Sequence, residues 1–294
     1  MGSRSNVVEM ADIDRVGVIG SGLMGSGIAE VCAKAGLDVL VREINASAAE
    51  AGLARLTASF DRAVRNGKLD EAARDSAMKN IRFTTDLADM ADRELVIEAA
   101  IEDEALKTDI FRQLDAIVTS PTALLASNTS SIPITRLGAV TGRPENVLGM
   151  HFFNPVPVLR LCEMVQGART SSESMDRAAA FATDRLGKTV IRSKDQAGFI
   201  VNALLVPYLL AAIRMHANGF ASAEDIDAGM IEGCAHPMGP LRLSDLIGLD
   251  TLVFVANSLY EEFKEPLYAA PPALLRMVEA GLLGRKSGHG FYTY

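Results

Sequence analysis

Cysteine is scarce in this sequence. Only Cys32, Cys162 and Cys234 occur among the 294 residues, and they lie far apart. Such a small and scattered set argues against a disulfide framework or a zinc site, and it suits a protein of a reducing compartment. No other group of His, Cys, Asp and Glu residues has the spacing of metal ligands. We therefore expect neither structural disulfides nor a metal.

Basic residues are fewer than acidic ones. The chain has 29 Lys and Arg against 37 Asp and Glu, which gives a formal net charge of -8. This balance provides no positive surface for a polyanion, so it argues against nucleic acid or an anionic membrane as the main partner. A small anionic ligand in a local basic pocket is still compatible with it.

No apolar run is long enough to cross a membrane. The longest, residues 199–213, contains Asn202 and Pro207 and predicts a buried helix instead. Residues 1–12 lack the apolar core of a secretion signal, so fold reasoning starts at Ile13. The length, with 49% hydrophobic and 22% charged residues, is typical of a globular protein of about two domains. We expect a cytoplasmic protein.

The clearest motif is a glycine turn between a strand and a helix. Residues 15–19 form a short apolar run, GSGLMG follows at residues 20–25, and residues 28–35 have a helical pattern. In this context the glycines allow a tight turn, close approach of the backbone to a pyrophosphate, and packing of the helix on the strand. The motif predicts a dinucleotide site.

The end of the second predicted strand bears on the choice of dinucleotide. Residues 37–41 form that strand, and Glu43 follows it. A carboxylate there can bond the ribose hydroxyls of NAD and repel the additional phosphate of NADP. The neighbouring Arg42 has the opposite tendency, so NADP stays open. The plainer alternative is that Glu43 is a solvated loop residue.

Strands and helices alternate through the first two thirds of the chain. This alternation predicts an α/β fold with a doubly wound, Rossmann-type, mostly parallel sheet. Residues 46–65 and 70–79 add a helical pair where a minimal unit would pass directly to its third strand. Further helices are expected over 103–118 and 174–186, and further strands over 81–85, 95–99, 123–127, 160–165 and 188–191.

A parallel sheet places its ligand sites beyond the carboxyl ends of the strands. By that rule one crevice should collect several polar residues that follow strands. They are Glu102, Asn128, Ser130 and His151, with Lys107 one helical turn away.

His151 is the strongest candidate for acid-base chemistry. It ends an apolar run and is followed by Asn154-Pro155, where the chain must leave the sheet. If the next strand turns back alongside, Glu163 can meet the imidazole, fix its tautomer and stabilise its protonated form. That pair makes a general base. The alternative is an ordinary buried histidine beside a strand glutamate.

The strand signal ends near residue 198. Helices are expected over 199–216, 224–232, 244–246, 251–263 and 272–280. We therefore predict two domains, a dinucleotide-binding domain at 13–194 and an all-α domain at 195–294. The first helix of the second domain is apolar nearly all round, which favours a subunit interface.

Seven strings in the chain together carry a family resemblance. The chain resembles the 3-hydroxyacyl-CoA dehydrogenase family, at its short-chain 3-hydroxybutyryl-CoA end, from about residue 15 to residue 294. The strings are GSGLMGSGIAE, VIEAAIEDEALK, ASNTSSIPI, HFFNPVPV with Glu163, AGFIVNALLVPYL, HPMGPLRLSDLIGLD and GRKSGHGFY. The resemblance implies an NAD-linked homodimer of fatty-acid and butanoate metabolism that interconverts (S)-3-hydroxyacyl-CoA and 3-ketoacyl-CoA.

The resemblance also implies roles for individual residues. His151 would be the catalytic base and Glu163 its orienting partner, while Ser130 and Asn202 would hydrogen-bond the reacting oxygen. The family's NAD contacts fall on Gly20, Ser21, Gly22, Leu23, Met24, Gly25, Glu43, Glu102, Lys107, Asn128, Ser130, Asn154 and Lys286.

Two positions depart from the family pattern. Glu43 stands where an Asp is usual, and Asn66 stands where some members carry a CoA-binding lysine. Ser59 and Ser130 match CoA contacts, and Arg65 or Lys68 would take the place of the missing lysine. The same catalytic set would also serve a non-CoA hydroxy acid or a carrier-protein-bound hydroxyacyl group. A dinucleotide-binding protein without turnover is the remaining alternative, against which both His151 and Glu163 argue.

Overall fold

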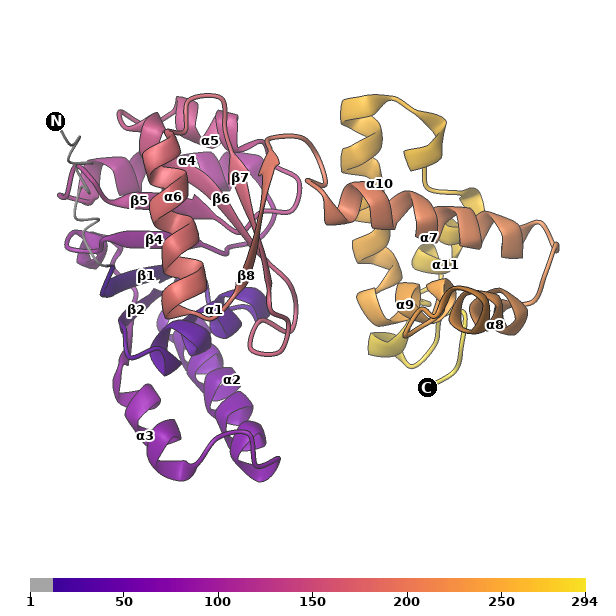
Figure 1. Ribbon diagram of the computed structural model, residues 1–294, viewed down its shortest axis with the longest axis horizontal. Helices are drawn as coiled ribbons and strands as arrows, with labels where there is room; N and C mark the ends of the chain where they lie inside the picture. The colour runs from indigo at the N-terminus through magenta and orange to yellow at the C-terminus, as the bar shows by residue number, and fades with distance from the viewer. Residues whose placement is uncertain (1–12) are drawn as a thin grey trace, which may run out of the picture. The chain divides into compact units, whose positions relative to one another are not determined.

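The computed structural model describes residues 13–294, and the chain divides into two compact units. The first ends at Asp195 and the second is Gln196–Tyr294. Figure 1 shows the strands and helices of the first unit and the helices of the second. The expected lack of a secretion signal concerns residues 1–12, which lie outside the described residues.

The first unit is built on an eight-stranded sheet in the order β3-β2-β1-β4-β5-β6-β7-β8. All neighbouring strands are parallel except β6 and β7, which are antiparallel. After β3 the chain crosses over to β4, which lies on the other side of β1. This topological switch point opens a crevice at the carboxyl ends of β1 and β4. The strands are β1 Arg15–Ile19, β2 Asp38–Arg42, β3 Ile81–Thr84, β4 Leu95–Glu98, β5 Leu124–Ser127, β6 Val147–Phe152, β7 Leu161–Gln166 and β8 Thr189–Lys194.

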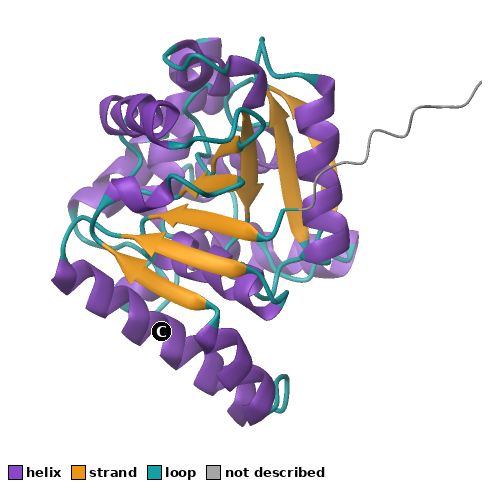
Figure 2. Cartoon of the chain, turned by 90° about the vertical axis from the view of Figure 1, so that its left-hand side faces the viewer, coloured by secondary structure: helices purple, strands orange, loops and turns teal. Residues whose placement is uncertain are grey.

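Helices cover the sheet, as Figure 2 shows with helices in purple around the orange strands. The hydrophobic core between sheet and helices includes Ile28 and Cys32 of α1, Phe60 of α2 and Met175 of α6. Cys162 on β7 is also part of this core, as its alternation with Glu163 predicts. The helices of this unit are α1 Leu23–Lys34, α2 Ala46–Arg65, α3 Glu71–Lys79, α4 Glu104–Ile117, α5 Ile134–Ala139 and α6 Ser172–Ala180.

The helical pair α2 and α3 forms an arm at one end of this unit (Figure 1). Its ends follow from local chemistry. Asn45 and Asp70 cap the two helices by accepting from the backbone N–H of Ala48 and Ala73. Beyond α2 the chain turns at Gly67, whose φ of +65° favours glycine.

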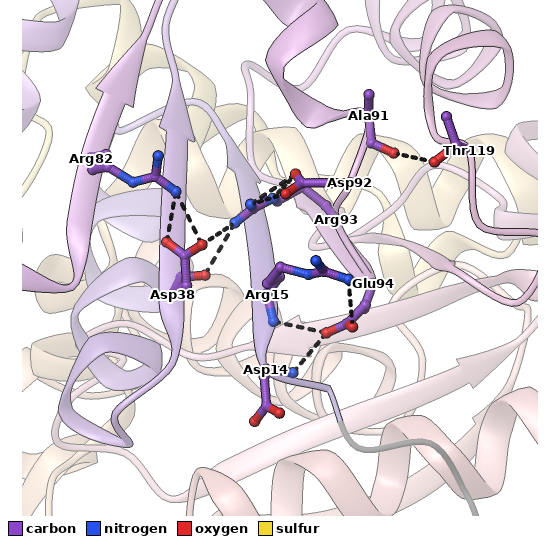
Figure 3. A network of polar contacts seen from close by, with 9 residues as sticks. All are labelled: Asp14, Arg15, Asp38, Arg82, Ala91, Asp92, Arg93, Glu94 and Thr119. Atoms are coloured by element: carbon purple, nitrogen blue, oxygen red, sulfur yellow. Dashed lines mark hydrogen bonds and ion pairs between the residues drawn. The ribbon is translucent and has the colours of Figure 1, made fainter.

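Charged residues join the amino ends of β1, β2 and β4 (Figure 3). Arg93, 2% exposed, donates to Asp92 and to Asp38 Oδ2, and Arg82 donates to both oxygens of the Asp38 carboxylate. Arg15 pairs with Glu94 at 2.9 Å. This cluster lies at the edge of the sheet opposite to the carboxyl ends of the parallel strands.

The second unit consists of helices α7 Val201–Ala217, α8 Ala223–Cys234, α9 Pro240–Ile247, α10 Leu249–Phe263 and α11 Pro272–Glu279. Buried Asp245 accepts hydrogen bonds from the backbone N–H of Phe291 and Tyr292, which ties the C-terminal segment to α9. Among residues 13–294 no single helix is long and apolar enough to cross a membrane. Only α9 and α10 together reach the required length, and they are bent by 96°.

The structure differs from the sequence-based expectation at several elements, among them α9, which begins at Pro240 and not at residue 244. Helix α1 begins at Leu23, five residues before the expected start, because the last half of the glycine motif is already helical. The expected helix at 174–186 ends in a π-helical turn at Phe181–Arg185. The short helix α5 has no counterpart among the expected elements. Its N-terminal amides at Ile134 and Thr135 are held by the Asp195 carboxylate, a contact 60 residues away in the chain.

Candidate active site

The glycine turn after β1 has the geometry of a dinucleotide cradle. Gly20 has a φ of +90°, a conformation that side chains disfavour. A Cβ at Gly25 would lie 1.9 Å from the Gly20 carbonyl oxygen, so glycine is required for the first turn of α1 to pack there. A Cβ at Gly22 would meet nothing within 4 Å, which leaves the backbone at the helix N-terminus open to an anion.

Glu43, just beyond β2, reaches the same turn. Its Oε1 accepts hydrogen bonds from the Ser21 backbone N–H and, at 2.7 Å, from the Ser21 hydroxyl. The adjacent Arg42 has a buried Nε with no hydrogen-bond partner. Arg55 of α2 donates to the Ser21 carbonyl. The Glu43 carboxylate and the Arg55 guanidinium therefore both contact Ser21 of the turn.

His151 and Glu163 face each other across the antiparallel strands β6 and β7, where they are register partners. The imidazole Nδ1 lies 2.7 Å from the Glu163 Oε2, and both residues are buried, at 4% and 0% exposure. An ionised carboxylate only accepts hydrogen bonds, so Nδ1 carries the hydrogen of a neutral imidazole. Nε2 is then the proton acceptor.

Ser130 lies at this second nitrogen. Its Oγ is 3.0 Å from His151 Nε2, and it is only partly buried. Asn128 fixes the start of the same loop, because its side-chain oxygen accepts from the Phe152 backbone N–H at 2.9 Å. The Phe153 ring packs against the imidazole with 4.6 Å between ring centroids. A hydroxyl and an imidazole thus converge where the crevice was predicted.

Glu102 and Lys107 also lie at this edge, but in different ways. Glu102 Oε1 accepts from the Ser130 backbone N–H at 3.0 Å and from the Thr129 hydroxyl. Lys107 is 1% exposed, and its Nζ donates to Glu98 Oε1 at 2.6 Å. Lys107 therefore lies behind Glu102, whose Oε2 is 3.1 Å from its Nζ.

The other predicted site residues are more scattered. Leu23 and Asn154 are exposed at the start of α1 and after β6, and Met24 is partly buried. Ser59 lies half-buried on α2, with Arg65 in its exposed last turn and Lys68 in the loop that follows. Asn202 and Lys286 belong to the second unit, where Lys286 pairs with Asp250 at 2.5 Å.

Sequence reasoning missed Glu98, Ser127 and Thr129, all of them nearly inaccessible at 0–1% exposure. The available signal was an acid and a serine that each end an otherwise apolar strand, LVIE and LLAS. Within the described part of the chain, no three His, Cys, Asp or Glu side chains are grouped so that they could hold a metal ion.

Comparison with known proteins identifies the family. Residues 15–196 match the NAD-binding domain of 3-hydroxyacyl-CoA dehydrogenase, and residues 198–294 match its C-terminal domain. The chain belongs to the 3-hydroxyacyl-CoA dehydrogenase family. This confirms the predicted family, the Rossmann-type fold with a helical C-terminal part, the NAD cofactor and the oxidoreductase class.

Several members of the 3-hydroxyacyl-CoA dehydrogenase family are similar over their whole length. A 3-hydroxybutyryl-CoA dehydrogenase of Mycobacterium tuberculosis is 58% identical over 282 residues, 96% of this chain and 99% of that protein. The crystal structure of M. tuberculosis FadB2 superimposes with a TM-score of 0.95 at 58% identity, covering 97% of this chain and 100% of that one. The (S)-3-hydroxybutyryl-CoA dehydrogenase of Ralstonia eutropha has a TM-score of 0.91 at 45% identity, covering 96% and 99%.

Proposed function

We propose that the chain is an NAD-dependent dehydrogenase that interconverts (S)-3-hydroxybutyryl-CoA and acetoacetyl-CoA. The observation that carries the proposal is His151, held by Glu163 at Nδ1 and meeting Ser130 Oγ at Nε2. Similarity to 3-hydroxybutyryl-CoA dehydrogenases at up to 58% identity supports the substrate.

The residues around the glycine turn are suited to bind NAD. The glycine turn at 20–25 leaves backbone open at the N-terminus of α1, and Glu43 lies beside it as a ribose partner. We assign the remaining cofactor contacts to Glu102, Asn128, Ser130, Asn154 and Lys286, with Lys107 behind Glu102. When bound, NAD accepts a hydride from the alcohol carbon, or returns it as NADH.

Loss of hydride from a secondary alcohol also requires loss of the hydroxyl proton. His151 Nε2 takes this proton during oxidation and returns it to the carbonyl oxygen during reduction. The Glu163 carboxylate offsets the charge of the imidazolium and holds the ring in place. Ser130 donates a hydrogen bond to the reacting oxygen, and we assign Asn202 of the second unit to the same oxygen from the family pattern.

Two further proposals concern binding of the CoA moiety and dimerisation. We assign Ser59, Arg65 and Lys68 to the CoA moiety, because α2 and its following loop offer exposed cations in an otherwise acidic chain. We also propose a cytoplasmic homodimer that forms through the second unit. Helix α7 supports this because it exposes large apolar side chains that an interface would cover. Leu204 is 72% exposed and Met215 is 42% exposed.

A spectrophotometric assay tests the function. NADH oxidation should proceed with acetoacetyl-CoA and should be far slower with free acetoacetate or with acetoacetyl carrier protein at equal concentration. Faster turnover with free acetoacetate or the carrier-bound substrate would transfer the assignment to that substrate. The lack of turnover with all three, together with normal NADH binding, would leave a binding protein only.

A further inference from the structure

A buried carboxylate lies next to residues 127–132, the loop that carries Ser130 (the catalytic loop). Glu98, at the end of β4, is 0% exposed. Its Oε1 accepts from the Ala100 backbone N–H at 2.7 Å and from Lys107 Nζ at 2.6 Å, and its Oε2 accepts from Ser127 Oγ at 2.6 Å. Both carboxylate oxygens of Glu98 are therefore occupied by groups of its own chain.

One route leads from Glu98 to the catalytic loop through Lys107. The Lys107 ammonium also lies 3.1 Å from Glu102 Oε2 and 3.4 Å from the Ala100 carbonyl oxygen. The other oxygen of Glu102 holds the Ser130 backbone N–H and the Thr129 hydroxyl. Glu98, Lys107 and Glu102 thus form a chain of ion pairs that ends on the loop that carries Ser130.

A second route reaches the same loop through Ser127. With its hydroxyl hydrogen given to Glu98, the Ser127 Oγ accepts from the Thr129 backbone N–H at 3.2 Å. Thr129 Oγ1 in turn accepts from the backbone N–H of Ser131 and Ile132. Both routes converge on residues 127–132 and share one origin, the Glu98 carboxylate.

We propose that Glu98 is a positioning residue that holds the 127–132 loop so that Ser130 Oγ stays within 3.0 Å of His151 Nε2. The proposal rests on the proposed function for its kinetic readout. A buried charge with full hydrogen bonding is costly to assemble and fixes geometry where it is retained. Misplacing a reacting group by about 1 Å can cost on the order of 100-fold in rate.

Glu98→Gln is the first test, because it preserves shape and removes the charge that orients Lys107. We expect kcat with acetoacetyl-CoA to fall about 10- to 100-fold. Ser127→Ala cuts only the second route and should lower kcat by a smaller factor. Both variants act through one carboxylate. The kcat of the double variant should therefore be at most about threefold lower than the kcat of Glu98→Gln alone.

Arg93→Met is the matched control. Arg93 is also a charge at 2% exposure within a carboxylate cluster, but that cluster lies at the amino ends of the strands (Figure 3). It should lower the thermal midpoint while kcat stays at the wild-type value. If Glu98→Gln keeps wild-type kcat, or if Arg93→Met loses kcat to the same extent, the positioning role is wrong.

An NMR readout separates this proposal from the proposed function. The ring 15N signals of His151 can be recorded in the NADH complex without substrate. In Glu98→Gln they should shift relative to wild type, while in Arg93→Met they should not. If the wild-type enzyme failed to turn over acetoacetyl-CoA, the proposed function would fall, whereas unchanged ring signals in Glu98→Gln would overturn the positioning role.

Discussion

The imidazole Nδ1 of His151 lies 2.7 Å from the carboxylate of Glu163, directly across two paired antiparallel strands. Backbone pairing on both sides of this contact makes it part of the sheet itself. The register therefore places the two side chains opposite each other, and the hydrogen bond at Nδ1 together with the packing of Phe153 orients the ring so that Nε2 faces Ser130.

Replacing the base should abolish most of the turnover while cofactor binding survives. Acid-base catalysis by a positioned side chain typically contributes about 10² to 10⁴-fold. We expect His151→Gln to lose at least that range in kcat with acetoacetyl-CoA, with an NADH dissociation constant within about threefold of wild type. Stopped-flow turnover and NADH fluorescence titration measure the two quantities. A His151→Gln enzyme with near-normal turnover would remove the assignment.

Glu163→Gln isolates the contribution of the carboxylate. An amide at this position can still accept from Nδ1 through its oxygen, but it no longer offsets the imidazolium charge. We expect kcat to fall while the NADH dissociation constant stays constant. Met164→Leu, on the neighbouring buried position of β7, serves as a packing control and should keep wild-type kcat.

Glu43 should decide the preference between the two nicotinamide cofactors. The Glu43→Ala variant loses a ribose acceptor and an anionic charge, while Arg42, next to it in the chain and with an unpartnered Nε, is retained. We expect the KM for NADH to rise and the KM for NADPH to fall. The ratio of kcat/KM for the two cofactors measures the change. Adding Arg42→Ala should reverse the gain with NADPH, and a gain that persists would show that Arg42 is not its source.

The parts of the fold that could be predicted from sequence are those encoded locally. Strand β1, the glycine turn and Glu43 occur within about thirty residues, and each has a motif or a periodicity of its own. The pairing of His151 with Glu163 was also within reach, because Asn154-Pro155 forces the chain out of the sheet between them. The start of α1 was misjudged because glycines carry little helical signal.

The parts that could not be predicted depend on contacts between distant segments. Glu98 and Ser127 approach each other only because β4 and β5 are adjacent and in register, a relationship that has no local pattern. Helix α5 depends on Asp195 capping it from 60 residues away. The partners of Lys107 at this edge, Glu98, Glu102 and the Ala100 carbonyl, likewise come from other segments than its own helix.

The inserted helices should recognise the phosphates of CoA. Arg65 and Lys68 are exposed, so removing both should cost only about two- to tenfold in affinity, in line with weakly coupled surface charges. We expect Arg65→Ala/Lys68→Ala to raise the KM for acetoacetyl-CoA and to leave the KM for acetoacetyl-pantetheine, which lacks those phosphates, unchanged. Lys79→Ala on α3 is the matched control. Equal effects on both substrates would contradict phosphate recognition.

The charged cluster at the amino ends of the strands should make the first unit sensitive to acid. Burial by itself raises the pKa of Asp38, but hydrogen bonds from Arg82 and Arg93 outweigh it and hold the pKa below its usual value near 3.8. The Asp92 carboxyl has a lowered pKa mainly because Arg93 donates to it. Since the folded pKa lies below the unfolded one, these groups stabilise the fold above about pH 4 and cease to do so as the pH falls.

Asp38→Asn should therefore lower the urea midpoint at pH 6 and have progressively less effect between pH 4 and pH 3. In wild type the contribution of Asp38 declines once the pH falls below the unfolded pKa near 3.8 and is lost as the pH falls through the lower folded pKa, so the two proteins should converge towards low pH. Circular dichroism during urea unfolding at each pH measures the difference. Glu50→Gln, exposed on α2, should run parallel to wild type throughout. A constant gap between Asp38→Asn and wild type would mean that the contribution of Asp38 does not depend on its ionisation.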